Sequence, residues 1–121
     1  MRSEGGADEV FVVRVEPPDG SSGILRDAPV LARVSHRLDM STLSTESVRI
    51  VGPSGPISMR IELSRDGFVL ICRPDRPLEA GVEHRVLILG LRDARGREVM
   101  PHESRFVPGG LGLDDLEEEA C

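Results

Sequence analysis

A chain of 121 residues is long enough for one domain with a modest core. Its formal net charge of −6 is concentrated at the C-terminus, where the last residues carry five acids and no arginine: Asp114, Asp115, Glu117, Glu118 and Glu119. The other 16 of the 21 acidic residues are balanced by 15 basic residues, all of them arginine, so no basic surface favours nucleic acid and we expect no nucleic-acid partner.

The first strand is predicted over residues 10–15, after a flexible leader over residues 1–9. Proline, aspartate and glycine at 17–20 end this strand, and the turn is expected to continue through 21–23. A second strand is predicted over 29–35, because alternate positions place three apolar side chains on one face: Val30, Ala32 and Val34.

The polar segment 39–46 is predicted to form one short helical turn. Asp39 or Ser41 is a suitable N-terminal cap, because both side chains can accept a backbone N–H. Met40 and Leu43 are expected to face inward from this turn.

A β-hairpin over residues 57–74 is the clearest feature of the sequence, and it follows a short strand at 48–51 that the segment 52–56 stops. Asp66-Gly67 suits a two-residue loop, because glycine accepts a positive φ without a Cβ clash. This loop places all the alternating apolar residues on one face, and it sets the pairs Arg65–Phe68, Leu63–Leu70 and Ile61–Cys72.

The C-terminal half continues the β pattern. A strand is predicted over 83–91, with His84, Val86 and Ile88 on one face, and 93–96 form a turn with Gly96 at the position that needs a positive φ. Residues 103–107 close the domain, with Phe106 inward. Seven to eight short strands at this spacing predict an all-β sandwich with one helical turn, over residues 10–108.

Several segments also follow one another in an order typical of a known family: Val15-Glu16-Pro17-Pro18-Asp19-Gly20, Val34-Ser35-His36-Arg37-Leu38-Asp39 with Ser41-Thr42-Leu43, Arg73-Pro74 with Pro77-Leu78-Glu79-Ala80-Gly81, and Leu91-Arg92-Asp93-Ala94-Arg95-Gly96. This order resembles the bacterial Ig-like domain of S-layer and other surface proteins, over about residues 11–107. The resemblance implies an Ig-like sandwich that acts as a structural or spacer module, and it implies no catalytic residues. Val34, His84 and Arg97 stand where that family tends to have Phe, Tyr and Asn.

Metal sites and catalysis have weak support. His36, His84 and His102 lie on different segments without ligand spacing, so we expect His84 to bond the backbone at a corner and the other two to lie on loops. Loop carboxylates could bind calcium, but none forms a dense Asp-x-Asp run: Asp19, Asp39, Asp75 and Asp93. We expect no metal and no cofactor.

An enzyme is not expected either, because no Gly-x-Ser-x-Gly motif is present. Ser35 and His36 would point to opposite faces if their strand continued. A carbohydrate partner is disfavoured, because the chain has no Trp or Tyr to stack on a sugar.

Cys72 falls on an inward strand position and Cys121 is the last residue, so we expect both thiols to be reduced. Residues 1–9 lack the apolar stretch of a signal peptide, and no apolar run is long enough to cross a membrane. If the chain is complete, this favours a cytoplasmic protein or one in a particle assembled inside the cell. A fragment of a surface protein would be extracellular.

The segment 109–121 begins with glycines, and Leu113, Leu116 and Ala120 then recur at helical spacing beside the five acids. One hypothesis is that Leu113–Glu119 docks on a basic, grooved protein partner. The other is that the segment is a solvated tail that keeps the domain soluble.

The leading function is therefore a non-enzymatic structural or assembly module that binds other proteins, for which a phage-like or contractile particle is one setting. The alternative is a spacer or adhesin module of a surface protein. Tandem copies or an upstream signal peptide in the reading frame would favour the alternative.

Overall fold

The computed structural model describes residues 9–109. The predicted leader (1–9) and the predicted C-terminal segment (109–121) therefore lie outside the described residues, except for Glu9 and Gly109. Strands and one 3-10 turn, η1 (Met40–Thr42), make up the regular structure of this range. The strands are β1 (Val12–Glu16), β2 (Ser21–Ile24), β3 (Val30–Val34), β4 (Val48–Gly52), β5 (Gly55–Pro56), β6 (Met59–Leu63), β7 (Val69–Pro74), β8 (His84–Ile88) and β9 (His102–Pro108).

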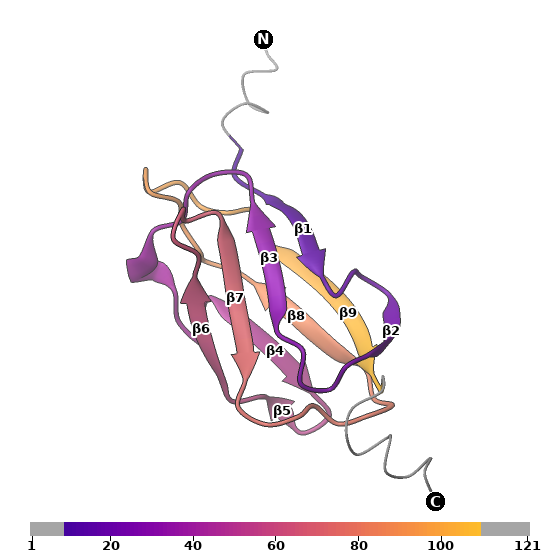
Figure 1. Cartoon of the computed structure of the whole chain (residues 1–121). Helices are drawn as coiled ribbons and strands as arrows, with labels where there is room; N and C mark the ends of the chain where they lie inside the picture. Colours follow the sequence, from indigo (N-terminus) through magenta and orange to yellow (C-terminus); the bar gives the residue numbers. More distant parts are fainter. Residues whose placement is uncertain (1–8, 110–121) are drawn as a thin grey trace, which may run out of the picture.

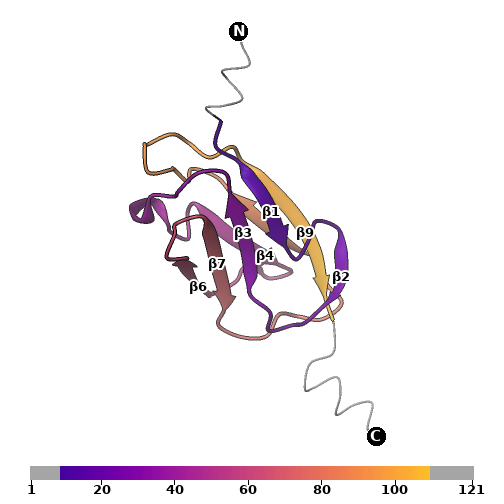
Figure 2. The same cartoon turned by 45° about the horizontal axis from the view of Figure 1, so that its top comes forward.

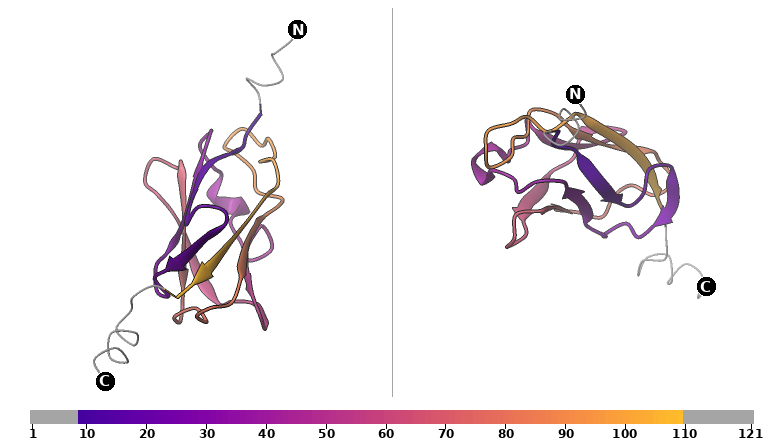
Figure 3. Two further views of the ribbon diagram at one scale, coloured as in Figure 1. Left: turned by 90° about the vertical axis from the view of Figure 1, so that its right-hand side faces the viewer. Right: turned by 90° about the horizontal axis from the view of Figure 1, so that it is seen from above.

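The strands form two sheets that pack face to face (Figure 1; Figure 3, left). One sheet has the order β1-β3-β7-β6 and the other the order β2-β9-β8-β4-β5. The pairs are antiparallel except for β2 and β9, which are parallel. This architecture confirms the predicted all-β sandwich with one short helical turn.

The core lies between the two sheets and consists mostly of alternating inward residues. Val30, Ala32 and Val34 of β3 are buried, as predicted, and so are His84, Val86 and Ile88 of β8. Phe106 of β9 is also buried, as predicted. Because Trp and Tyr are absent, Val, Ile and Leu supply most of the buried side chains.

The hairpin formed by β6 and β7 has the predicted register, with Leu63 opposite Leu70 and Ile61 opposite Cys72. Its loop is longer than predicted, because the Ser64 N–H bonds to the Val69 carbonyl at 2.8 Å and leaves residues 65–68 outside the ladder. The predicted pair of Arg65 with Phe68 is therefore wrong. The Phe68 carbonyl instead accepts the Val34 N–H of β3 at 2.9 Å.

Two segments expected to be turns are short strands, which brings the described residues to nine strands. Residues 21–24 form β2 because β9 lies beside them, and 55–56 form β5 by folding back on β4. Neither pairing has a local alternating pattern that could predict it. The first strand begins at Val12, and Val10 instead forms a bridge with Val99.

The helical turn is present, with the Asp39 carboxylate accepting the Ser41 N–H at 3.0 Å as the expected cap. Leu43 packs against the core, but the inward placement of Met40 is wrong, since this side chain is 69% exposed. The turn is a single 3-10 turn on the surface, too short to carry an inward face of its own.

The chain crosses the sandwich from end to end. In Figures 1 and 2, β1 starts at the upper end and β9 finishes at the lower end. We call the first end the N-terminal pole, which also holds the end of β3 and the turn between β6 and β7. The other end, with the corner between β7 and β8, is the C-terminal pole.

Candidate functional site

A pocket of about 460 Å³ opens at the N-terminal pole, and we call it the arginine pocket. Three segments distant in sequence meet there: the residues after β3, the β6–β7 turn and the loop that follows β8. Its lining residues are His36, Arg37, Phe68, Asp93, Ala94, Arg95 and Arg97. Basic side chains therefore surround a single carboxylate.

Asp93 is that carboxylate, and its side chain is 1% exposed. It accepts the backbone N–H groups of Arg95 and Arg97 at 3.1 and 2.8 Å, and the Arg97 guanidinium at 2.9 and 3.0 Å. Burial raises the pKa of Asp93, but the Arg97 and Arg95 hydrogen bonds and the Arg97 charge outweigh burial, and the pKa ends below its usual value. Asp93 thus organises the 93–97 loop as an ionised group.

Arg37 and Arg95 provide the remaining charge of the pocket. Among the described residues, no hydrogen bond or ion pair engages either guanidinium. The stem of Arg37 lies across Gly67, so closely that a Cβ on Gly67 would overlap Arg37 Cγ. The Arg37 carbonyl accepts the Ala94 N–H at 2.8 Å, which joins the two walls of the pocket.

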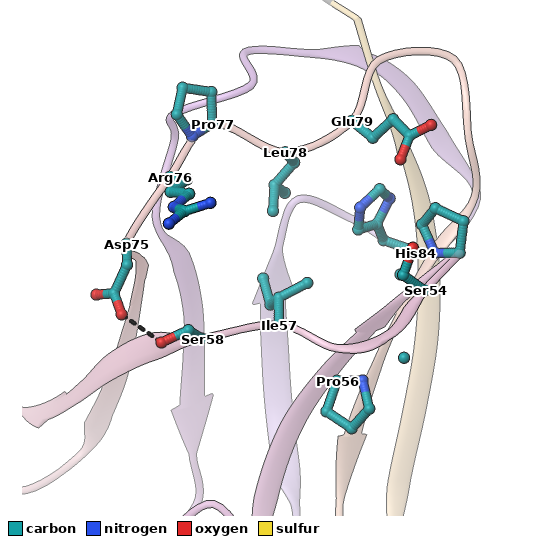
Figure 4. Close-up of a pocket in the computed structure, with 13 residues that line it drawn as sticks. Ser54, Pro56, Ile57, Ser58, Asp75, Arg76, Pro77, Leu78, Glu79 and His84 are labelled. Carbon is teal, nitrogen blue, oxygen red and sulfur yellow. Dashed lines mark hydrogen bonds between the residues drawn. The ribbon is translucent and has the colours of Figure 1, made fainter.

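A second pocket, of about 470 Å³, lies at the C-terminal pole, and we call it the corner pocket (Figure 4). The segment 52–58 forms one wall and the corner 75–79 forms the other. Ile57, Leu78 and His84 lie toward its centre. The Ser58 hydroxyl donates to the Asp75 carboxylate and connects the two walls.

His84 is 1% exposed and has a structural role in this corner. Its Nδ1 donates to the Val82 carbonyl at 2.8 Å, because a carbonyl oxygen can only accept. Its ring stacks on Phe106 with 5.7 Å between centroids, and a Cβ at Gly52 would lie 3.0 Å from Nε2. This confirms the prediction that His84 bonds the backbone at a corner.

Ser35 and His36 contact one another directly after the end of β3. Because β3 ends at Val34, the two side chains do not point to opposite faces, and Ser35 Oγ lies 2.8 Å from His36 Nδ1. The same Oγ accepts the Phe11 N–H at 2.9 Å, which fixes the serine between neighbouring segments. No carboxylate of the described range bonds to His36, so a third member that would orient the imidazole is missing from this contact.

The other candidate residues stay apart. His36 lies on a loop as expected, whereas His102 is the first residue of β9 and not a loop residue. Each of the four loop aspartates accepts a hydrogen bond from another part of the domain or from its own loop: Asp19 from the Arg105 N–H, Asp39 from Ser41, Asp75 from Ser58 and Asp93 from the 93–97 loop. Within residues 9–109, no three His, Cys, Asp or Glu side chains gather as a metal cluster.

The segment Leu113–Glu119, our predicted partner-binding site, lies outside the described residues. Sequence reasoning did not single out Arg37, Arg95 or Arg97 as site residues. The sequence feature that could have identified this site is the high number of arginines around the 93–96 turn, where we predicted only a turn.

No protein-family model and no curated protein matches the chain, whereas solved structures do. The N-terminal part of the bacterial S-layer protein SbsC has a TM-score of 0.65 at 19% identity, over 87% of this chain and 24% of that chain. CopC from Methylosinus trichosporium OB3b has a TM-score of 0.70 at 13% identity, over 86% and 97%. An L,D-transpeptidase from Mycobacterium smegmatis has a TM-score of 0.60 at 21% identity, over 83% and 40%.

These similarities establish the β-sandwich fold. Against SbsC domains 1-6, this chain spans only 14% of the length of the other protein. The S-layer domains and this chain share the β-sandwich fold. In the described range no helix is long and apolar enough to cross a membrane.

Proposed function

We propose that this chain is a non-catalytic, Ig-like module that serves as a spacer or adhesin in a cell-surface protein. The observation that carries the proposal is the path of the chain, which enters the sandwich at one pole with β1 and leaves at the other with β9 (Figure 1). Modules with ends at opposite poles extend a protein when they are joined in series. The seven residues of β9 alone span about 23 Å along this direction.

The similar structures support the surface setting over the cytoplasmic one that the N-terminal sequence favoured. Domains of an S-layer protein share the fold over 87 to 88% of this chain. A phage-like or contractile particle draws no support from the similar structures described above. The order of the sequence motifs adds the Ig-like type to this proposal.

The chemistry of the two pockets supports a non-catalytic role. His84 is stacked on Phe106 and bonded to the Val82 carbonyl, and Asp93 is bonded to its own loop. Each group therefore stabilises a bend of the chain. The partners that we expect are proteins, because the absence of Trp and Tyr removes the aromatic platforms that bind sugars.

Direct fusions of two and three copies of residues 9–109 test the spacer geometry by small-angle X-ray scattering. The account predicts that each added copy increases the maximum dimension by a constant step of at least the length of β9, about 23 Å. The single copy is the control. A maximum dimension that stops growing after the second copy would mean that the copies fold against one another, and the spacer proposal would fail.

A further inference from the structure

We propose that the arginine pocket binds carboxylate groups, and that its occupant is the acidic segment Asp114–Glu119 of a second copy of this chain. The contact would join the N-terminal pole of one copy to the C-terminal segment of the next. This inference goes beyond the spacer role and does not depend on it, because fused modules need no contact between free copies.

The first step is the charge of the pocket. Asp93 and Arg97 neutralise one another at 2.9 Å, so Arg37 and Arg95 leave two positive charges at the mouth. Both residues are exposed, and among the described residues neither guanidinium has a hydrogen bond or an ion pair. A guanidinium presents paired N–H donors whose spacing matches a carboxylate, so acidic side chains fit this site chemically.

The second step is that the backbone positions of these two arginines are fixed before a ligand binds. The Arg37 carbonyl accepts the Ala94 N–H at 2.8 Å, and the Arg95 N–H donates to Asp93 at 3.1 Å. Gly67 packs directly under the Arg37 stem. A ligand therefore has only the ends of two side chains to order, which lowers the entropy cost of binding.

The third step is the identity of the ligand. Residues 1–108 contain nearly equal numbers of acids and arginines, whereas the segment after Gly109 has five acids and no arginine. This segment therefore carries a strong negative charge, whereas the pocket carries a positive charge. Leu113 and Leu116 lie among these acids, and the half-buried Phe68 ring in the pocket wall offers an apolar contact for such residues.

The fourth step is that geometry favours a second copy. The described chain ends at the C-terminal pole, and the arginine pocket lies at the other pole, at least the length of β9 away, about 23 Å. From Gly109 to Asp114, a fully extended chain reaches at most about 17 Å. Asp114 therefore falls short of its own pocket, so the whole segment Asp114–Glu119 can be bound only by the pocket of another copy, although the last acids, at up to about 34 Å from Gly109, have a longer reach.

Such a contact is heterologous: one surface of the module binds a different surface of the next. Sedimentation velocity of the full chain, in low salt and with a reductant to keep Cys121 from cross-linking copies, measures this association. A fluorescent peptide of residues 109–121, titrated with the full chain, measures binding at the pocket by anisotropy. The key variant is Arg37→Glu with Arg95→Glu, and the matched control is Arg60→Glu with Arg76→Glu, which makes the same charge change elsewhere on the surface.

The expected result is concentration-dependent association that weakens in about 0.5 M salt, where exposed ion pairs are screened. The pocket variant should bind the peptide at least tenfold more weakly, and the control variant should bind as the unmodified chain does. A peptide with its acids changed to lysine should bind the pocket variant but not the unmodified chain. Urea unfolding of both variants checks that each is folded.

Three results would overturn the proposal. The first is a chain that stays monomeric at every concentration and does not bind the peptide. The second is equal peptide binding by the pocket and control variants. The third is that inorganic phosphate binds at Arg37 and Arg95 and the peptide does not displace the phosphate. The pocket would then bind small anions and not the acidic segment of another copy. The scattering measurement on fused copies, which lack the acidic segment, is unaffected by any of these.

Discussion

Asp93 shows how a single buried charge organises the site at the scale of one residue. It is 1% exposed and accepts two backbone N–H groups and the Arg97 guanidinium. Asp93→Asn replaces an ionised acceptor by an amide that also points donors at Arg97. We expect the variant to lose about 1.5 to 3 kcal/mol of unfolding free energy at pH 7, the range for hydrogen bonds to charged groups.

The loss of stability in Asp93→Asn should also depend on pH. The folded-state pKa of Asp93 is lowered, so its contribution is fully present above the ordinary carboxyl pKa of about 3.9 and is lost as the pH falls through the folded value. The stability difference between the natural chain and Asp93→Asn should therefore be full at pH 7 and shrink as the pH falls below about 3.9. Urea unfolding at pH 7 and at a series of pH values below about 3.9 measures this difference, and a difference that stays constant would contradict an ionised Asp93.

Gly67 and Gly96 form a matched pair of glycines in the arginine pocket region. Both have positive φ, 82° and 84°, but a Cβ at Gly67 would overlap the Arg37 stem, whereas none of the surrounding atoms lies within 4 Å of a Cβ at Gly96. Gly96→Ala should cost about 1 kcal/mol from backbone strain alone. Gly67→Ala should cost clearly more, and thermal or urea unfolding compares them. Equal costs would mean that Arg37 moves aside freely.

Cys72 offers a test of burial in the core strand β7. Burial raises the pKa of its thiol to about 12, and the residue is 1% exposed. A Cys121→Ser variant isolates this thiol for titration with a thiol-specific reagent at about pH 8, where almost no thiolate is present. We expect no reaction in the native state and full reaction after unfolding in urea. Rapid reaction of the native protein would show that β7 is not buried as described.

At the scale of elements, the β6–β7 hairpin distinguishes a central strand from an edge strand. Leu70 in β7 is fully buried, whereas its partner Leu63 in the edge strand β6 is half-buried. Leu70→Ala should therefore cost about 3 to 4 kcal/mol of unfolding free energy and Leu63→Ala about 1 to 2. Chemical denaturation compares the two variants. A larger loss at Leu63 would contradict the placement of β7 inside the sheet and of β6 at its edge.

The strands and register of the hairpin were predictable from their alternation, whereas the length of its loop was not, because the Ser64 N–H bond to the Val69 carbonyl leaves residues 65–68 unpaired. Val30, Val34, His84 and Phe106 were predictable for the same reason, since period-two alternation places them on the inner face. The strands β2 and β5 were not, because their pairing partners, not their own sequences, make them strands. Met40 was misplaced because a single 3-10 turn has no helical face to bury.

The candidate site was predictable only in part. Asp93 and Gly96 identified the turn, and the bond from Gly96 N–H to the Asp93 carbonyl at 2.9 Å confirms it. The arginine pocket as a unit was not predictable, because it needs Arg37, Phe68 and the 93–97 loop to meet across three chain segments. The Ser35–His36 contact was missed for a related reason, since it depends on where β3 ends.

At the scale of the whole molecule, the two poles differ in a way that suits a module in series. The N-terminal pole holds the arginine pocket, and the C-terminal pole holds the corner pocket and the end of β9. A sandwich in which β1 starts at one pole and β9 finishes at the other (Figures 1 and 2) adds length to a protein when modules are joined in series. We propose that the protein uses this length at the cell surface.

The most direct test of that claim is antibody labelling of native host cells. An antibody raised against residues 9–109 is suitable, whereas amine-reactive surface labels are not, because the chain has no lysine. The account predicts labelling of intact cells, at a level that permeabilisation does not increase much. Labelling that appears only after permeabilisation would place the protein inside the cell and contradict the account.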